Sequence, residues 1–136
     1  MILVDTSAWV EYDRATGSAL DQRLTGLIAA GGGEVASTEP ILMEVLAGAR
    51  DERRHRDLRR LLTSFTWIAA DPAADFEGAA RIYRSCRAAG ITPRGLVDCM
   101  IASIAIRSGT TVLAADADFE QIGTVVPLRR EKALPE

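Results

Sequence analysis

The stretch that decides the fold is Ile2–Ala15, "ILVDTSAWVEYDRA". Three apolar residues come first, an aspartate follows, and the remaining residues have the composition of a helix. We expect a short buried strand at 2–4 and a helix at 6–15, with Thr6 or Ser7 as its N-cap. A strand that ends at an acid and passes directly into a helix is typical of a unit in a parallel sheet.

The same alternation of apolar strands and helices continues along the chain. Further strands are predicted at 34–37, 66–70, 110–115 and 125–128, helices at 18–30, 38–49, 51–65, 71–90 and 92–109, and a turn or short helix at 116–123. This order predicts an α/β fold with a central, mainly parallel β-sheet flanked by helices. A length of 136 residues without a repeat or linker predicts a single domain over 1–136.

Composition narrows the possible functions. The net charge of −3 gives no general support to nucleic-acid binding, but residues 49–60 hold six arginines against three acids, and residues 81–94 hold four arginines and no acid. These segments fit either phosphate contacts or ordinary solvated helix faces. Cys86 and Cys99 follow no metal or redox spacing and are expected to be reduced core thiols. Without a signal-like segment or a membrane-length apolar run, we expect a soluble, cytoplasmic protein with no membrane partner.

One acid stands in an unusual place. Asp98 is the only charge in "GLVDCMIASIAI" (Gly95–Ile106), which is long and apolar enough to be a buried helix. Burying an unpaired carboxylate is costly, so such a group needs a partner, a raised pKa or a metal.

Three further acids are expected to lie near Asp98. Asp5 and Asp116 each end a predicted strand, and Glu44 lies in an apolar helix early after the second strand. Ligands of parallel sheets bind at the carboxyl ends of the strands, where these acids would meet. Each acid alone has an ordinary explanation as a turn former, a helix cap or a solvated side chain. Together they would repel one another by about 4 kcal/mol per pair at 4 Å.

A divalent cation would relieve that repulsion. Oxygen ligands without a nearby histidine or cysteine fit Mg²⁺ or Mn²⁺, and we expect Asp5, Asp98 and Asp116 to be the ligands. A cation held by carboxylates activates water for phosphate chemistry, so phosphodiester hydrolysis is the leading reaction class.

Four motifs occur in order along nearly the whole chain: "ILVDTSAWVEY", "EPILMEVLAGAR", "RGLVDCMIASIAI" and "VLAADADFEQI". Through them the chain resembles the PIN-domain ribonucleases, and specifically the VapC-type toxins of bacterial toxin–antitoxin pairs. The resemblance implies a catalytic quartet of acids around Mg²⁺ or Mn²⁺, matched here by Asp5, Glu44, Asp98 and Asp116. It implies that Ser7 supports the site and that Asp118 is available to a second ion. Arg94 is a candidate RNA contact, or else a surface arginine at a helix start.

The resemblance also implies a PIN-like fold, endonucleolytic cleavage of structured RNA such as a tRNA or a ribosomal loop, a VapB-type antitoxin as partner, and a homodimer. The apolar helix at 38–49 and the arginine-rich helix at 51–65 are candidate walls of a partner groove. Two alternatives stay open: a non-catalytic binding module that only holds a metal, and an RNase H-like nuclease, which would begin with long antiparallel strands.

Overall fold

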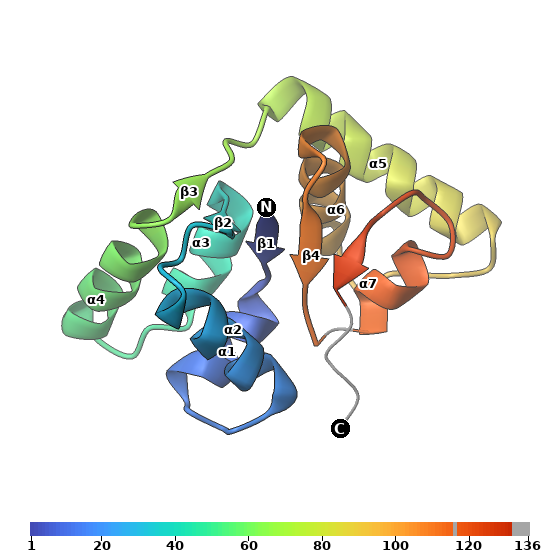
Figure 1. The fold of residues 1–136 in the computed structure, drawn as a ribbon. Coiled ribbons are helices and arrows are strands. Elements are labelled where there is room, and N and C mark those ends of the chain that lie inside the picture. The colour runs from blue at the N-terminus through green and yellow to red at the C-terminus, as the bar shows by residue number, and fades with distance from the viewer. Residues whose placement is uncertain (116, 132–136) are drawn as a thin grey trace.

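The chain folds around a five-stranded sheet with helices on both sides (Figure 1). The structure is a computed structural model, and it describes residues 1–115 and 117–131. Its elements are β1 (Ile2–Val4), α1 (Thr6–Asp13), α2 (Ala19–Ala29), β2 (Val35–Ser37), α3 (Glu39–Ala47), α4 (Glu52–Thr63), β3 (Thr66–Trp67), α5 (Pro72–Ala88), α6 (Leu96–Ser108), β4 (Thr111–Leu113), α7 (Ala117–Ile122) and β5 (Arg130–Glu131). In the part described, no helix combines the length and apolarity needed to cross a membrane.

The strand order places β1 at the centre of the sheet. The order is β3-β2-β1-β4-β5, and each neighbouring pair is parallel, with Ile2 opposite both Val35 and Thr111. The predicted α/β fold is therefore confirmed, and the described strands lack the antiparallel start of an RNase H-like nuclease. The chain builds β1, β2 and β3 outward and then crosses back to place β4 on the other side of β1. Such a switch point opens a crevice at the carboxyl ends of β1 and β4.

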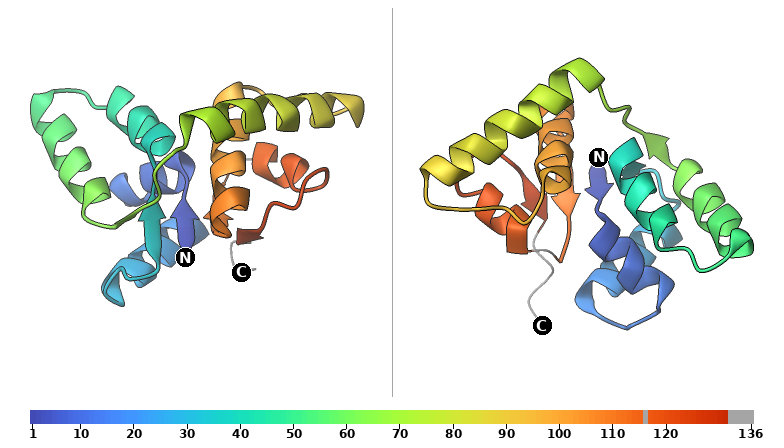
Figure 2. Two further views of the ribbon diagram at one scale, coloured as in Figure 1. Left: turned by 90° about the horizontal axis from the view of Figure 1, so that it is seen from above. Right: turned by 180° about the vertical axis from the view of Figure 1, so that it is seen from behind.

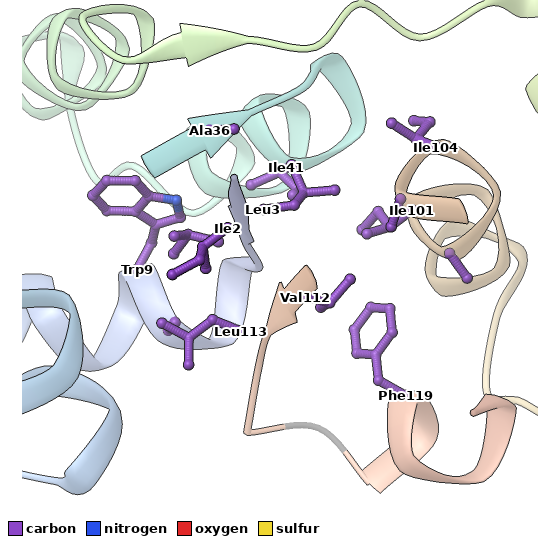
Figure 3. Close-up of a cluster of buried hydrophobic side chains, with 14 of the residues drawn as sticks. Ile2, Leu3, Trp9, Ala36, Ile41, Ile101, Ile104, Val112, Leu113 and Phe119 are labelled. Carbon is purple, nitrogen blue, oxygen red and sulfur yellow. The ribbon is translucent and has the colours of Figure 1, made fainter. Parts of the chain in front are cut away.

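A continuous apolar core supports this crevice. In the views of Figure 2, α3 and α6 cover one face of the sheet, with α5 packed along α6, and α2 lies on the other side. Figure 3 shows Leu3, Val112, Ile101 and Phe119, all fully or almost fully buried, gathered from β1, β4, α6 and α7. Strands buried on both faces read as apolar runs, which explains why β1 is simply "ILV".

The predicted strand at 125–128 is wrong, because β5 lies at Arg130–Glu131. The backbone N–H groups of Val125 and Val126 both donate to the carbonyl of Ile122, so this segment continues the turn that follows α7. Pro127 has no N–H to offer a sheet. The apolar character of "VVPL" reflects packing, with Leu128 buried, rather than pairing.

Two helix starts also differ from the prediction. The helix predicted at 92–109 begins at Leu96, because Gly95 is extended (φ −160°, ψ 167°) and forms the N-cap. The N-cap of α1 is Asp5 rather than Thr6 or Ser7. At the other end of α6, Gly109 adopts φ 68°, a left-handed conformation that favours glycine and ends the helix.

The crossing of α5 and α6 is fixed by close packing and by a buried acid. A Cβ at Gly78 would lie 2.3 Å from Ser103 Oγ, so only glycine allows this approach. Asp75, 1% exposed, accepts hydrogen bonds from Arg107 Nη2 (2.7 Å), Ser103 Oγ (2.9 Å) and the backbone N–H of Asp71 (2.7 Å). These contacts set the position of α6, whose first turn carries Asp98.

Candidate functional site

Asp5 lies at the carboxyl end of the central strand. As the N-cap of α1 it accepts two hydrogen bonds through Oδ2, from the Ser7 backbone N–H (3.1 Å) and from Ser7 Oγ (2.7 Å). Its second oxygen, Oδ1, is buried and has no hydrogen-bond partner among the described residues. A capping role thus uses one oxygen and leaves the other available to a ligand.

The environment of Asp5 disfavours a bare negative charge. The residue is only 4% exposed, and its burial raises the pKa to about 6. The hydrogen bonds from Ser7 lower the pKa, whereas the charge of Glu44 raises it. An unsatisfied buried carboxylate oxygen costs free energy, so this group gains from a proton or a cation.

Ser7 ties the ends of two neighbouring strands together. Its hydroxyl donates to Asp5 and accepts the backbone N–H of Ala115 at 3.0 Å. Ala115 follows β4, so one side chain links the first residue after β1 to the loop after β4. This contact orients the Asp5 carboxylate and fixes the loop beside it.

Glu44 reaches the same edge from α3. It is half-buried, and its Oε1 accepts a hydrogen bond from Thr6 Oγ1 at 2.8 Å. Its charge contributes to the raised pKa of Asp5, which shows that the two carboxylates are close enough to interact. The sequence predicts only a capping role for Thr6, although it lies between Asp5 and Ser7, because its partner Glu44 is 38 positions away.

Asp98 and Asp118 form a second group of acids, close to Cys99. Asp98 is half-buried in the first turn of α6, where the helix N-terminus favours an anion. Burial, followed by the charges of Cys86, Asp98 and Asp118, raises the pKa of the Cys99 thiol to about 11. Both acids therefore lie near the same buried cysteine. Cys86 and Cys99 are free and buried, as predicted.

Arg94 pairs with Asp118. Its Nε donates to Asp118 Oδ2 at 3.3 Å, with the arginine side chain 79% exposed and the aspartate side chain 9% exposed. From the sequence, Arg94 is either a candidate RNA contact or a surface arginine at a helix start. The structure places its guanidinium at the acidic edge while most of the side chain stays accessible.

The chain on either side of residue 116 contacts both groups of acids. Ala115 contacts Ser7, and Asp118 contacts Arg94. The predicted fourth acid, Asp116, lies outside the described residues. Within residues 1–115 and 117–131, no three His, Cys, Asp or Glu side chains are grouped closely enough to hold a metal ion. The described feature that fits a cation is the buried Asp5 Oδ1, which has no hydrogen-bond partner among the described residues and lies near enough to Glu44 to feel its charge.

A groove opens beside the site between α1, α3 and α4. Its volume is about 700 Å³, and Glu44 forms part of its lining, so the groove leads to the acidic edge. An ion pair between Asp13 and Arg54 joins α1 to α4 across it. The predicted walls of a partner groove therefore do enclose a groove. Its other lining residues are Trp9, Val10, Arg14, Val45, Gly48, Ala49, Arg50, Asp51 and Leu58.

Fold and site together define a class: an α/β domain with an acidic site at the switch point of a parallel sheet. The chain belongs to the PIN domain family, whose sequence profile matches residues 2–125.

Named relatives and solved structures agree with this assignment. The chain is 46% identical over 129 residues to VapC ribonuclease Mb1587 of Mycobacterium bovis and to ribonuclease VapC11 of Mycobacterium tuberculosis, covering 95% of this chain and 96% of each relative. The fold resembles VapBC2 from Rickettsia felis, solved bound to a promoter DNA fragment (TM-score 0.75, 20% identity, covering 96% of this chain and 98% of that one). It also resembles M. tuberculosis VapC20, described as a sarcin-ricin loop cleaving toxin (TM-score 0.69, 21% identity, covering 95% and 99%).

Proposed function

We propose that this chain is a metal-dependent endoribonuclease, the toxin of a VapBC-type toxin–antitoxin pair, which hydrolyses phosphodiester bonds in structured RNA such as a tRNA or a ribosomal loop. The observation that carries the proposal is the buried Asp5 carboxylate at the β1–β4 switch point, with one oxygen held by Ser7 and the other without a partner. Its support from relatives is the 46% identity to proteins named VapC ribonucleases. With this function we expect the protein to act in the cytoplasm. We also expect residues 1–136 to form a single domain.

The proposed cofactor is Mg²⁺, with Mn²⁺ as a substitute, held by Asp5, Asp98 and Asp116. A cation of this kind supplies Lewis acidity and lowers the pKa of bound water. Asp5 presents Oδ1, while Ser7 keeps the carboxylate from rotating. Glu44, held by Thr6, would be the base that takes the proton of the attacking water. Asp118, which pairs with Arg94, would help to hold a second ion, and the exposed Arg94 would contact a phosphate of the RNA.

Cleavage by purified chain, free of any partner, tests this proposal. With Mg²⁺ or Mn²⁺ we expect discrete products from a mixture of bacterial tRNA and rRNA, and none with EDTA. Asp98→Asn should abolish cleavage, whereas the exposed Asp57→Asn on α4 should leave it unchanged. Undiminished cleavage in EDTA would exclude the metal mechanism. Tight metal binding without cleavage of any RNA would favour the non-catalytic binding module.

The proposed protein partner is a VapB-type antitoxin that binds in the groove between α1, α3 and α4. Several solved neighbours are VapBC complexes, and the groove has apolar walls with charges of both signs at its rim. Val10 lines this groove and is 36% exposed, so a substitution there tests whether the partner binds in the groove. Val10→Asp should prevent co-purification of the partner, and the exposed Ala80→Asp on α5 should not. Equal recovery with both variants would place the partner elsewhere.

We also propose a homodimer formed through an apolar patch. The patch consists of Met43 and Phe76, which are 56% and 61% exposed, together with Val97 and Met100. Exposed apolar side chains grouped in this way mark an interface more often than free surface.

A further inference from the structure

Arginines on the second half of α5 form a basic surface with its own charge pattern. Arg81, Arg84 and Arg87 recur every three residues and are all exposed. At about 1.5 Å rise per residue, neighbouring guanidinium groups leave the helix about 4.5 Å apart along its axis. The acids of α5, Asp75 and Glu77, precede this run. Successive arginines are also turned by about 60° around the helix axis, so the run presents three positive charges along a shallow spiral.

These arginines differ from others of the chain in their ion pairing. Arg23, Arg54 and Arg107 are each paired with a carboxylate. In the described part of the chain, none of Arg81, Arg84 and Arg87 makes such an ion pair. Glu77, one helical turn before Arg81, is the acid closest to them along the helix.

Arg84, Arg87 and an aromatic side chain form a local arrangement suited to nucleic acid. The two arginines line a shallow depression of about 400 Å³ together with Ala88. The Arg87 guanidinium lies 6.0 Å from the centre of the Tyr83 ring, which is half-buried. Arginines that line a phosphate path and aromatic rings on which bases stack are the usual parts of a single-strand binding surface.

A single loop joins this surface to the proposed active site. The loop after α5 turns back to the start of α6, as the right-hand view of Figure 2 shows, and it carries Arg94 four residues before Asp98. An acidic site on a chain of net charge −3 repels RNA unless cations near it hold the flanking phosphates. The arginines of α4 are less suited, because Asp51, Glu52 and Asp57 lie among them.

We infer that Arg81, Arg84 and Arg87, with Tyr83, form the surface that holds the RNA strand beyond the cleaved bond. This inference rests on the proposed ribonuclease function and adds to it the path of the substrate. It assigns the surface to RNA rather than to the antitoxin, whose proposed groove lies between α1, α3 and α4.

The test measures RNA binding separately from cleavage. A fluorescent 20-nucleotide polyuridine is titrated with protein that carries Asp98→Asn, in EDTA and at several salt concentrations. Adding Arg81→Gln, Arg84→Gln and Arg87→Gln should weaken binding at least tenfold. It should also reduce the slope of log Kd against log salt by about 2, since each phosphate contact to a single strand contributes about 0.7. The control is Arg56→Gln, Arg59→Gln and Arg60→Gln, three exposed arginines of α4, which should change neither quantity.

A second variant separates charge from folding. Arg81→Lys, Arg84→Lys and Arg87→Lys keeps the positive charge and should retain most of the binding and of the salt slope. Equal weakening by the α5 and α4 triple variants, or unchanged binding by the α5 triple, would overturn the inference. Loss of a co-purified protein partner with RNA binding intact would assign the surface to that partner instead.

The two proposals fail in different ways. Wild-type cleavage in Mg²⁺ together with unchanged RNA binding by the α5 triple refutes only the RNA path. Absence of wild-type cleavage together with lost binding by the α5 triple refutes the nuclease and leaves an RNA-binding surface.

Discussion

Asp5 performs two tasks whose electrostatic requirements conflict. As a helix cap it is stabilised by hydrogen bonds from Ser7, and as a buried acid beside Glu44 it is destabilised when ionised. The raised pKa of about 6 shows that the second effect exceeds the first. The metal-free protein therefore stores unfavourable free energy at this residue, which a bound cation would release.

Replacing Asp5 by asparagine should stabilise the metal-free protein at pH 8 by roughly 1–3 kcal/mol, because a shift from 3.8 to about 6 corresponds to about 3 kcal/mol. In the wild type, the folded state holds an extra proton between these two values, so stability should fall as pH rises from about 4 to 6. The variant should lack this fall. Urea unfolding in EDTA at pH 4, 6 and 8 measures the difference.

The melting temperature with and without Mg²⁺ provides a second test of the role of Asp5. Mg²⁺ should raise the melting temperature of the wild type and have little effect on Asp5→Asn. An asparagine variant that is less stable than the wild type at pH 8 and still responds fully to Mg²⁺ would show that Asp5 is only a cap.

At the scale of elements, α6 connects the core to the site. Its apolar residues pack in the core, its first turn presents Asp98, and its last turn is clamped by Arg107. Burial raises the pKa of Asp75, but hydrogen bonds from Arg107, the Asp71 N–H and Ser103 outweigh it, so the pKa is lowered overall. The clamp is thus strongest when Asp75 is ionised.

Arg107→Ala should reduce the free energy of unfolding by about 2 kcal/mol at pH 7. This is less than the ~3–5 kcal/mol of fully buried pairs, because Arg107 is 38% exposed. Since the folded pKa of Asp75 is lowered, the stabilisation is present above the unfolded value of 3.8 and is lost as pH falls below it. The difference in free energy of unfolding between wild type and variant should therefore become smaller below about pH 4. Chemical denaturation checks this, with Arg60→Ala as an exposed control; a difference independent of pH would refute the role of ionised Asp75.

The same elements show what the sequence can and cannot predict. Apolar runs that end at acids predicted β1, β4 and the edge where Asp5 lies, since burial on both faces leaves a clear pattern. The pattern failed at "VVPL", where apolar residues pack without pairing, and at the start of α6, where Gly95 rather than Pro93 sets the boundary. The contacts of Thr6 with Glu44 and of Ser7 with Ala115 depend on tertiary distances, which local sequence does not encode.

At the scale of the whole molecule, the proposed surfaces are formed by different residues, although they share α3 and α5. The partner groove lies between α1, α3 and α4, the basic surface follows the second half of α5, and the apolar patch combines α3, the start of α5 and the start of α6. The proposed active site lies at the ends of β1 and β4 and at the first turn of α6. This division allows the three surfaces to be altered one at a time.

Met43→Ser combined with Phe76→Ser should convert a dimer into a monomer, because it removes the two most exposed apolar side chains that line the patch. Sedimentation equilibrium over a range of concentrations measures the association constant. The comparison variant is Ala80→Ser, an exposed change on α5, which should leave association unchanged. A wild type that stays monomeric at every concentration would show that the patch serves another purpose.

The central position of β1 has a consequence for synthesis on the ribosome. Residues 2–4 are translated first, gain one neighbour when residues 35–37 are made, and gain the second only with residues 111–113. The 76 residues between 37 and 113 take about 4–15 s at ~5–20 residues per second. During that interval the nascent chain holds Asp5 without the Ala115 contact that Ser7 later makes. The proposed active site is therefore among the last features to assemble, and a chain interrupted before β4 never acquires it.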